Sequence, residues 1–356
     1  MLNDYLDWPG LGQVYRLERK FDWLRRGKVY KTCCQIEYGI TSLSRNQASP
    51  PLIAILEKAI SLYSIQNSIP PTKQYNSPII RFKEHAGADE ELMITVGFAQ
   101  FSPLRYHVEQ NIASLKKLLA GVKADVLVLP ELANSGYMYA TPDELAPFAE
   151  EPDGHGPFLS ALREIAGAIG GVIVTGFAEK SAGRLYNSAA AVDFAGVIQV
   201  YRKTHLFSDE NDLFTPGDSG FGVFEYRQAR IGMMVCFDWF FPEAARSLAL
   251  KGAQIIAHPA NLVLPYCQLG MVTRSLENVV FSITCNRYGV EQIGQKSLRF
   301  TGCSQVLDTK GNLLFQAPAE GDNVYCCEID PAIANNKKIN PHNDLFAGRR
   351  PDLYSL

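Results

Sequence analysis

Three side chains that could together perform acyl transfer are widely separated in this chain. Each comes just after a run with the apolar character of a buried strand: Glu131 after 126–129, Lys203 after 197–201 and Cys236 after 231–235. A thiol can act as nucleophile, a carboxylate as general base and an ammonium group as stabiliser of an oxyanion. Alone, Cys236 and Lys203 are more often structural and Glu131 is so about as often as not, but together the three predict a covalent acyl-enzyme.

Cys236 is predicted to lie at a corner between a strand and a helix. The run 231–235 suits a strand, and Pro242 followed by Glu243 and two alanines is typical of a first helical turn. Backbone N–H groups at such a corner can face developing negative charge, and we expect the N–H of Phe237 to do so beside Lys203. The positive charge of Lys203 is also expected to favour the thiolate.

Composition limits the classes of protein to consider. The chain has 356 residues, of which 47% are hydrophobic and 20% charged, as in ordinary soluble globular proteins. A formal net charge of -3 gives no global electrostatic reason to expect nucleic acid or an anionic membrane as a partner. We find no run near the roughly 20 apolar residues of a membrane span and no signal peptide, so we expect a cytoplasmic protein.

The cysteines do not indicate a metal site or a disulfide scaffold. Eight are present without metal-type C-x-x-C spacing, and they are expected to be reduced thiols: 33, 34, 236, 267, 285, 303, 326 and 327.

From residue 92 onward, strands and helices are predicted to alternate, which indicates an α/β fold. The predicted helices are 107–119, 156–169, one from 242 to 250, and 271–278; the predicted strands are 93–100, 126–129, 172–177, 188–192, 197–201, 231–235, 255–258, 282–286, 302–307 and 325–329. So many short hydrophobic strands favour two sheets packed face to face, with helices outside.

Residues 1–91 are predicted to form a small N-terminal extension before the domain at 92–356. It contains helical spacing at 49–63 and a polar linker at 67–91. The stretches 7–19 and 38–43 resemble the C-terminal part of IS4-like DDE transposases. That family's late glutamate, a metal ligand, is replaced here by Gln66, whose neutral amide lacks the charge. We interpret the extension as an inactive remnant; an ordinary accessory domain is the alternative.

The larger domain resembles the nitrilase superfamily of carbon-nitrogen hydrolases. The motifs are Leu-Pro-Glu at Glu131, Tyr-Arg-Lys-Thr-His-Leu around Lys203, and Val-Cys-Phe-Asp followed by Phe-Pro-Glu around Cys236. The resemblance implies a four-layer α-β-β-α sandwich, a thioester intermediate with these three residues as catalytic, and no metal or organic cofactor. It also implies a homodimer or a higher homo-oligomer.

Further site residues follow from the same resemblance. Glu210 stands where many members carry a second glutamate that positions substrate and lysine; an exposed loop acid is the alternative. His258 and Asn261, in His-Pro-Ala-Asn, resemble the segment that lines the pocket beside the nucleophile. Arg274, Glu277 and Asn278 match a helix motif that we expect to be a structural brace.

The expected substrate is a small aliphatic amide, converted to a carboxylic acid and ammonia. Members that hydrolyse nitriles commonly carry Cys-Trp-Glu, whereas this chain has Cys236-Phe237-Asp238. The longer context around Cys236 and His258 also resembles small aliphatic nitrilases, so (di)nitriles and N-carbamoyl compounds remain alternatives. A DNA-binding protein derived from a transposase is a different class, which the net charge and Gln66 disfavour.

Overall fold

The computed structural model describes residues 93–354. The predicted N-terminal extension, with its helix at 49–63 and its transposase-like stretches, lies outside the described residues. Within them, the strands form two six-stranded sheets and two small two-stranded sheets.

The first large sheet is mixed. β1, β2 and β3 are parallel to one another, whereas β14, β4 and β5 pair antiparallel with their neighbours. Its strands, in spatial order, are β14 (Asn323–Ile329), β1 (Ile94–Gln100), β2 (Val126–Val128), β3 (Val172–Ser181), β4 (Arg184–Val192) and β5 (Val197–Arg202).

The second large sheet has the same plan. β7, β8 and β9 are parallel, and antiparallel strands flank them on both sides. Its strands, in spatial order, are β13 (Leu313–Gln316), β12 (Gln305–Leu307), β9 (Phe281–Asn286), β8 (Ile255–Ala260), β7 (Ala229–Met233) and β6 (Val223–Tyr226).

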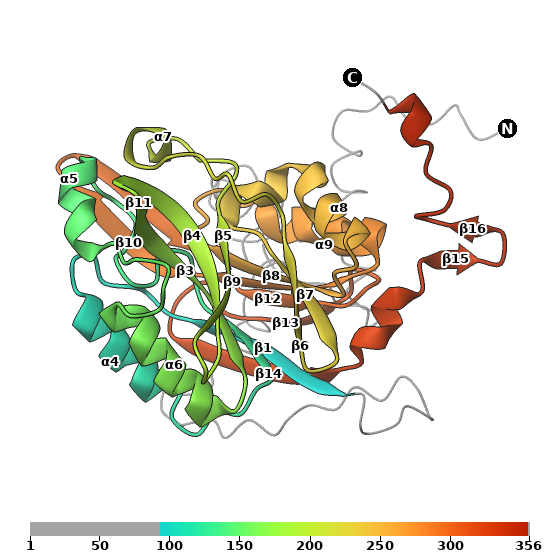
Figure 1. Cartoon of the computed structure of the whole chain (residues 1–356), viewed down its shortest axis with the longest axis horizontal. Coiled ribbons are helices and arrows are strands. Elements are labelled where there is room, and N and C mark those ends of the chain that lie inside the picture. Colours follow the sequence, from blue (N-terminus) through green and yellow to red (C-terminus); the bar gives the residue numbers. More distant parts are fainter. Residues whose placement is uncertain (1–92, 355–356) are drawn as a thin grey trace, which may run out of the picture. The chain divides into compact units, whose positions relative to one another are not determined.

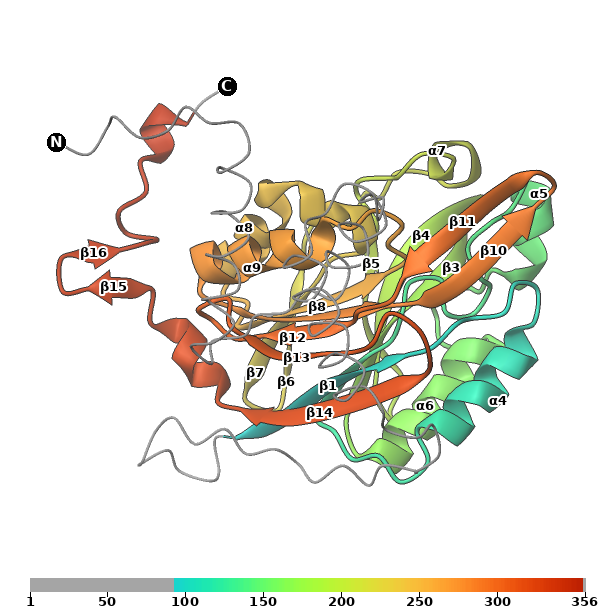
Figure 2. The same cartoon turned by 180° about the vertical axis from the view of Figure 1, so that it is seen from behind.

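Helices cover the outer faces of the two sheets. α4 (Val108–Leu118) and α6 (Pro157–Ile169) lie on one side, while α8 (Pro242–Leu250) and α9 (Cys267–Asn278) lie on the other (Figures 1 and 2). The strands are apolar on both faces because of this layering. In the run that includes β2, Val126 and Val128 belong to the core between the sheets, whereas Leu127 and Leu129 pack with the helical layer. The predicted α-β-β-α sandwich is confirmed.

The predicted helices and strands from 93 to 329 are all present, with shifts of a few residues at their ends. We did not predict β6, β13, the hairpin of β10 (Tyr288–Ile293) and β11 (Lys296–Thr301), or the pair β15 (Lys338–Asn340) and β16 (Asn343–Asp344). These strands are short or polar. In β10, Glu291 is the buried residue, so the strand has no apolar alternation to detect.

Short helices complete the described chain: α5 (Pro142–Leu145), α7 (Glu210–Leu213) and the 3-10 helices η2 (Ala146–Phe148), η3 (Cys236–Phe240), η4 (Pro331–Asn335) and η5 (Pro351–Leu353). The six cysteines between residues 93 and 354 are thiols rather than disulfides. Among the helices of this part of the chain, none combines the length and the apolar character needed to cross a bilayer.

Candidate active site

The structure brings Glu131, Lys203 and Cys236 together, although β2 and β5 belong to one sheet and β7 to the other. Lys203 Nζ lies 2.7 Å from Glu131 Oε1, and the charges of both residues act on the Cys236 thiol. All three side chains are buried. They meet because each follows the end of a strand and these strand ends converge between the two sheets.

Lys203 is enclosed by two carboxylates. Its Nζ donates to Glu131 Oε1 at 2.7 Å and to both oxygens of Glu210, at 2.8 and 2.7 Å. Burial by itself would lower the pKa of Lys203, but the charges of Glu131 and Glu210 raise it well above its usual value. Lys203 is therefore a fixed positive charge.

Glu210 is a buried partner of Lys203 and not an exposed loop acid. It begins α7, is 3% exposed, and accepts a hydrogen bond from the Tyr137 hydroxyl at 2.7 Å. Burial raises the pKa of Glu210 although the charge of Lys203 lowers it. Burial and the charge of Glu210 also raise the pKa of Tyr137 well above 10, so this hydroxyl stays protonated and donates. Tyr137 was not predicted as a site residue.

Glu131 presents one anchored oxygen and one oxygen without a partner. Oε1 accepts from Lys203 and from Asn187 Nδ2, both at 2.7 Å. Oε2 is buried and has no hydrogen-bond partner among the described residues. Asn187 lies within β4 and was also missed; the signal available was an amide just before the run Ser-Ala-Ala-Ala-Val in a predicted strand. A carboxylate oxygen that is buried without a hydrogen-bond partner is free to accept a proton.

The turn that carries Glu131 packs directly on β3 at Gly176. A Cβ built on Gly176 would lie 2.4 Å from Glu131 Cα and 2.7 Å from the Leu132 nitrogen. Gly176 N–H donates to Pro130 O at 3.0 Å, and the Ala133 N–H donates to Gly176 O at 2.9 Å. Glycine is needed here because the two backbones approach too closely for a side chain.

Cys236 lies at the predicted corner, in an uncommon backbone conformation. Extended Val235 precedes it, η3 begins at it, and its φ is +42°, in the left-handed region. Burial and the charge of Glu131 raise the pKa of the Cys236 thiol well above its usual value, and the charge of Lys203 only partly offsets this. The expectation that Lys203 favours the thiolate is therefore outweighed: the resting group is a thiol.

The first N–H groups of η3 precede its hydrogen-bonded turn. The first bond runs from the Asp238 N–H to Val235 O at 3.0 Å, after the N–H groups of Cys236 and Phe237. Such leading amides have no acceptor within a helix and suit developing negative charge. The Phe237 ring is half-buried and packs 5.0 Å from the ring of Phe207.

Asp238 joins the Lys203 segment to the Cys236 turn. Its buried carboxylate accepts from Val235 N at 2.8 Å, from the Tyr201 hydroxyl at 2.7 Å and from the His205 N–H at 3.1 Å. The His205 ring Nδ1 lies 2.8 Å from the same carboxylate. Tyr201 and His205 lie two residues on either side of Lys203. Asp238 therefore fixes residues 201–205 against the turn that carries Cys236. Sequence reasoning used Asp238 only as part of a motif.

His258 and Asn261 hold the backbone of the site. His258 Nε2 lies 2.9 Å from Cys236 O, and its Nδ1 lies 3.1 Å from the Thr284 hydroxyl. Burial lowers the pKa of His258 to about 4, so the ring is neutral, and Nε2 carries the hydrogen because a carbonyl can only accept. Asn261 Nδ2 donates to Glu131 O at 2.9 Å. In the resting site, both side chains contact the protein backbone.

The expected brace is also present. Arg274 Nε donates to Trp239 O at 3.1 Å and its guanidinium pairs with Glu277 at 3.0 Å, while Asn278 Nδ2 donates to Arg274 O at 2.9 Å. These contacts tie α9 to η3.

Comparison with known proteins gives the same picture. The sequence model of the carbon-nitrogen hydrolase family matches residues 95–337. A nitrilase of Pyrococcus abyssi is 42% identical over 266 residues, which are 74% of this chain and 99% of that protein. An N-carbamoylputrescine amidase of Solanum lycopersicum is 30% identical over 293 residues, covering 76% of this chain and 96% of the relative.

Solved structures share the fold. A carbon-nitrogen hydrolase from Helicobacter pylori G27 has a TM-score of 0.63 at 25% identity, covering 74% of this chain and 97% of that one. An amidase from Nesterenkonia sp. has a TM-score of 0.57 at 21% identity, covering 70% and 95%. With the family match over most of the chain and a buried glutamate, lysine and cysteine at one place, this protein belongs to the carbon-nitrogen hydrolases of the nitrilase superfamily.

Proposed function

We propose that this carbon-nitrogen hydrolase cleaves small aliphatic amides to a carboxylic acid and ammonia, with Glu131, Lys203 and Cys236 as its catalytic residues. The observation that carries the proposal is the Glu131 carboxylate. One of its oxygens is fixed by Lys203 and Asn187, the other is buried without a hydrogen-bond partner, and the charge of the carboxylate acts on the Cys236 thiol. This is the arrangement that a general base for Cys236 requires.

The first step is attack on the amide carbon. Because the resting Cys236 is a thiol, Glu131 Oε2 takes its proton as the C–S bond forms. The carbonyl oxygen gains negative charge and is stabilised by Lys203 and the Phe237 N–H. Lys203 makes two of its three contacts with a single carboxylate, that of Glu210, so one N–H can turn to the oxyanion without losing either glutamate.

The next steps return the proton and release the acid. Protonated Glu131 donates to the leaving nitrogen, the C–N bond breaks, and ammonia leaves a thioester on Cys236. Glu131 then takes a proton from water, the hydroxide adds to the thioester, and the C–S bond breaks. The proton returns from Glu131 to the sulfur, so the carboxylic acid is released and the thiol is restored.

Nitrile hydrolysis is the second candidate function. The relative from Pyrococcus abyssi at 42% identity is named a nitrilase, and this similarity favours nitriles. The sequence context of Cys236 and His258 narrows this candidate to small aliphatic (di)nitriles. N-carbamoyl compounds are a further alternative, supported by the N-carbamoylputrescine amidase of Solanum lycopersicum. All three substrates present an electrophilic carbon bound to nitrogen, and all three can be attacked by the same thiol.

The test is ammonia release from matched substrates. The same short acyl chains are offered as amide, as nitrile and as N-carbamoyl amine, and products are identified by mass spectrometry. We expect kcat/KM to be highest for the amides. A higher value for the nitriles would establish the second candidate, and a folded protein that is inert towards all three series would contradict the proposed function.

We also propose that the enzyme is a homodimer or a higher homo-oligomer. Apolar side chains of α9 support this, since Leu269 and Leu276 are about half exposed. Light scattering on the purified chain of 39.4 kDa measures the assembly directly, and a monomer at working concentration would contradict it.

Replacing Gly176 by alanine is expected to lower kcat/KM about 10- to 100-fold, because displacement of a catalytic group by about 1 Å has an effect of this size. The new Cβ meets the Glu131 backbone, which has to move. Gly167→Ala is the matched control: in α6, its nearest neighbour would be Phe194 Cβ at an ordinary 3.5 Å. Steady-state kinetics of both variants check this, and equal activity of the two would contradict it.

Replacing Asp238 by asparagine is expected to lower kcat/KM about 10- to 100-fold and the free energy of unfolding by about 2–3 kcal/mol. The amide has one acceptor oxygen, whereas the carboxylate receives contacts from Val235, Tyr201 and His205. Asp322→Asn, which alters a single exposed contact with Tyr288, is the control. Kinetics and urea unfolding measure both effects. An Asp238→Asn enzyme indistinguishable from this control would show that the contacts of the Asp238 carboxylate are not needed for activity or stability.

A further inference from the structure

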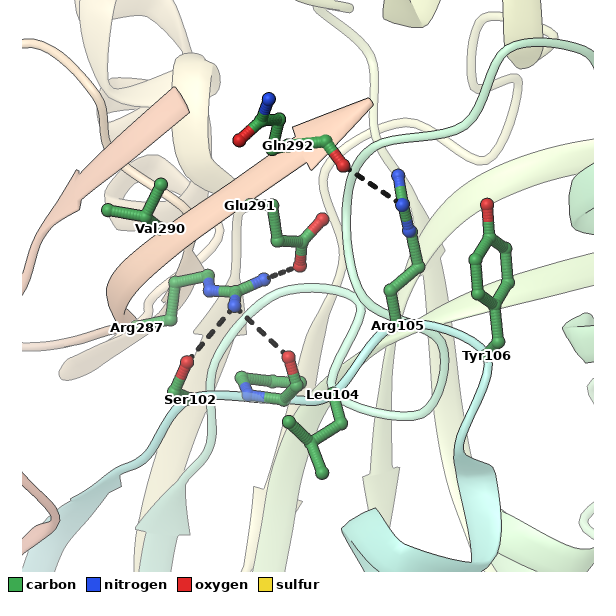
Figure 3. Close-up of a pocket in the computed structure, with 9 residues that line it drawn as sticks. Ser102, Leu104, Arg105, Tyr106, Arg287, Val290, Glu291 and Gln292 are labelled. Carbon is green, nitrogen blue, oxygen red and sulfur yellow. Dashed lines mark hydrogen bonds and ion pairs between the residues drawn. The ribbon is translucent and has the colours of Figure 1, made fainter. Parts of the chain in front are cut away.

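The hairpin formed by β10 and β11 lies outside both large sheets but has one buried acidic group. Glu291 is 8% exposed, whereas its neighbours Val290 and Gln292 are exposed. Figure 3 shows its carboxylate turned towards Arg287, beside a hollow of about 280 Å³ that both residues help to line. A carboxylate is buried in this way only when donors satisfy it.

The backbone donors to Glu291 come from the loop that follows Glu131. Tyr137 N–H lies 3.1 Å from each carboxylate oxygen, and Met138 N–H lies 2.8 Å from Oε2. Arg287 Nη1 forms an ion pair with Oε1. The hairpin therefore holds the backbone of residues 137 and 138 through one side chain.

Arg287 holds the Glu291 carboxylate in place through their ion pair. It is 1% exposed, and its Nη2 donates to Ser102 Oγ at 3.1 Å and to Pro103 O at 3.0 Å (Figure 3). Its guanidinium carbon also lies 4.2 Å from the centre of the Phe300 ring, on β11. Because these contacts involve the loop after β1 and both strands of the hairpin, Glu291 has little freedom to move.

Tyr137 connects Glu291 with Glu210, which is a partner of Lys203. Its backbone N–H is held by Glu291, its ring packs edge-on against Phe300 at 5.6 Å, and its hydroxyl donates to Glu210 Oε1 at 2.7 Å. Glu210 in turn contacts Lys203 Nζ through both oxygens. Glu291 is therefore linked to Lys203 by a chain of contacts through Tyr137 and Glu210.

We propose that Glu291 is a positioning residue for the reaction: it places the Tyr137 hydroxyl so that Glu210 holds Lys203 in its working position. The proposal rests on the function proposed above. It assigns a role in turnover to a hairpin that contributes no group to the reacting atoms.

Glu291→Gln tests it with little change in shape. The amide offers one acceptor oxygen and directs its NH₂ group at donors from Tyr137, Met138 or Arg287. We expect kcat to fall about 10- to 100-fold while KM stays within about threefold, since the change acts on placement and not on substrate contact. Glu320→Gln is the control: Glu320 pairs with Arg299 of β11 in an exposed ion pair, and its loss should change kcat less than about twofold.

A double-mutant cycle with Tyr137→Phe identifies the route. Tyr137→Phe removes only the hydroxyl and is itself expected to lower kcat about 10-fold or more. In the Tyr137→Phe background, Glu291→Gln should lower kcat by less than about threefold, because the hydroxyl through which Glu291 acts is already missing. The same loss in both backgrounds would overturn the proposal, as would an unchanged kcat of folded Glu291→Gln.

Two further outcomes are decisive. If Glu291→Gln does not fold, Tyr137→Phe with wild-type kcat still overturns the proposal. If the wild-type protein is inert towards the substrate panel, the proposed function fails separately, and the rate at which iodoacetamide alkylates Cys236, measured by mass spectrometry, replaces kcat in the same cycle. Equal alkylation rates of the wild type and Glu291→Gln would then count against the positioning role.

Discussion

Cys236→Ala is expected to reduce ammonia release at least about 10⁴-fold, to the rate of a protein-free blank, while the fold stays intact. The thioester forms on the Cys236 sulfur. Without this sulfur, the substrate can react only by direct attack of water with Glu131 as the base. Alanine has the same backbone requirements as cysteine at a φ of +42°, and the deleted sulfur leaves only a small space, so the loss is chemical rather than structural.

Two measurements accompany this variant. In the wild-type enzyme, acid quenching during turnover and mass spectrometry should find an acyl group on the peptide that contains Cys236. Cys326→Ala is the matched control, because this thiol lies on β14 and neither Glu131 nor Lys203 acts on its pKa, which burial alone raises, so the variant should keep wild-type kinetics. Undiminished turnover by Cys236→Ala would contradict the proposed mechanism.

Lys203→Met is expected to abolish turnover and to lower the free energy of unfolding by about 3–5 kcal/mol, the typical loss when one partner of a buried ion pair is removed. Methionine fills much of the volume of the lysine chain but supplies no charge. Glu131 and Glu210, which are 0% and 3% exposed, would then be two buried carboxylates without a cation. Urea unfolding and steady-state kinetics measure the two losses.

The stability loss of Lys203→Met should depend on pH in a defined direction. In the wild type, the charge of Lys203 lowers the pKa of Glu210, although burial keeps this pKa above its ordinary value. Removing Lys203 raises the folded-state pKa further. A carboxyl group with a raised folded-state pKa contributes its stability below the unfolded pKa and loses it as pH rises through the folded pKa. The variant should therefore be less destabilised at pH 5 than at pH 8.

A second substitution and a surface control complete this experiment. Adding Glu210→Gln to Lys203→Met removes one of the two uncompensated charges and should restore part of the stability without restoring turnover. Lys116→Met breaks an ion pair with Glu164 in which both side chains are at least half exposed, and its effect should be below about 1 kcal/mol. A destabilisation by Lys203→Met that is no larger than that of Lys116→Met would show that the buried cluster contributes little to stability.

The layers of the fold could be predicted from local patterns. The runs 126–129 and 231–235 carry no polar side chain, which is the pattern of strands covered on both faces, and the helices between them have regular apolar spacing. The hairpin of β10 and β11 could not be predicted, because the buried position of β10 is the acidic Glu291. Its burial depends on donors from residues 137 and 138, more than 150 positions earlier in the chain.

Some residues of the candidate site could be predicted from the sequence and others could not. Glu131, Lys203 and Cys236 carry reactive groups just after predicted strands and stand in family motifs, so the sequence identifies them as a set. Tyr137, Asn187 and Asp238 were missed because an aromatic hydroxyl, an amide and an acid beside a turn are common in any sequence. Their importance follows from contacts with Glu210, Glu131 and the Lys203 segment, and these contacts join residues between 33 and 73 positions apart.

By itself, the sequence determined which chemical groups the protein has, the order in which its strands and helices appear, and the family motifs in which Glu131, Lys203 and Cys236 stand. Only the tertiary structure decided the ionisation states of Lys203 and Cys236. Burial and the charge of Glu131 keep Cys236 a thiol against the pull of Lys203, while two carboxylates keep the buried Lys203 charged. The physical reason is that desolvation and Coulomb interactions depend on distances in space, which the packing of the two sheets sets.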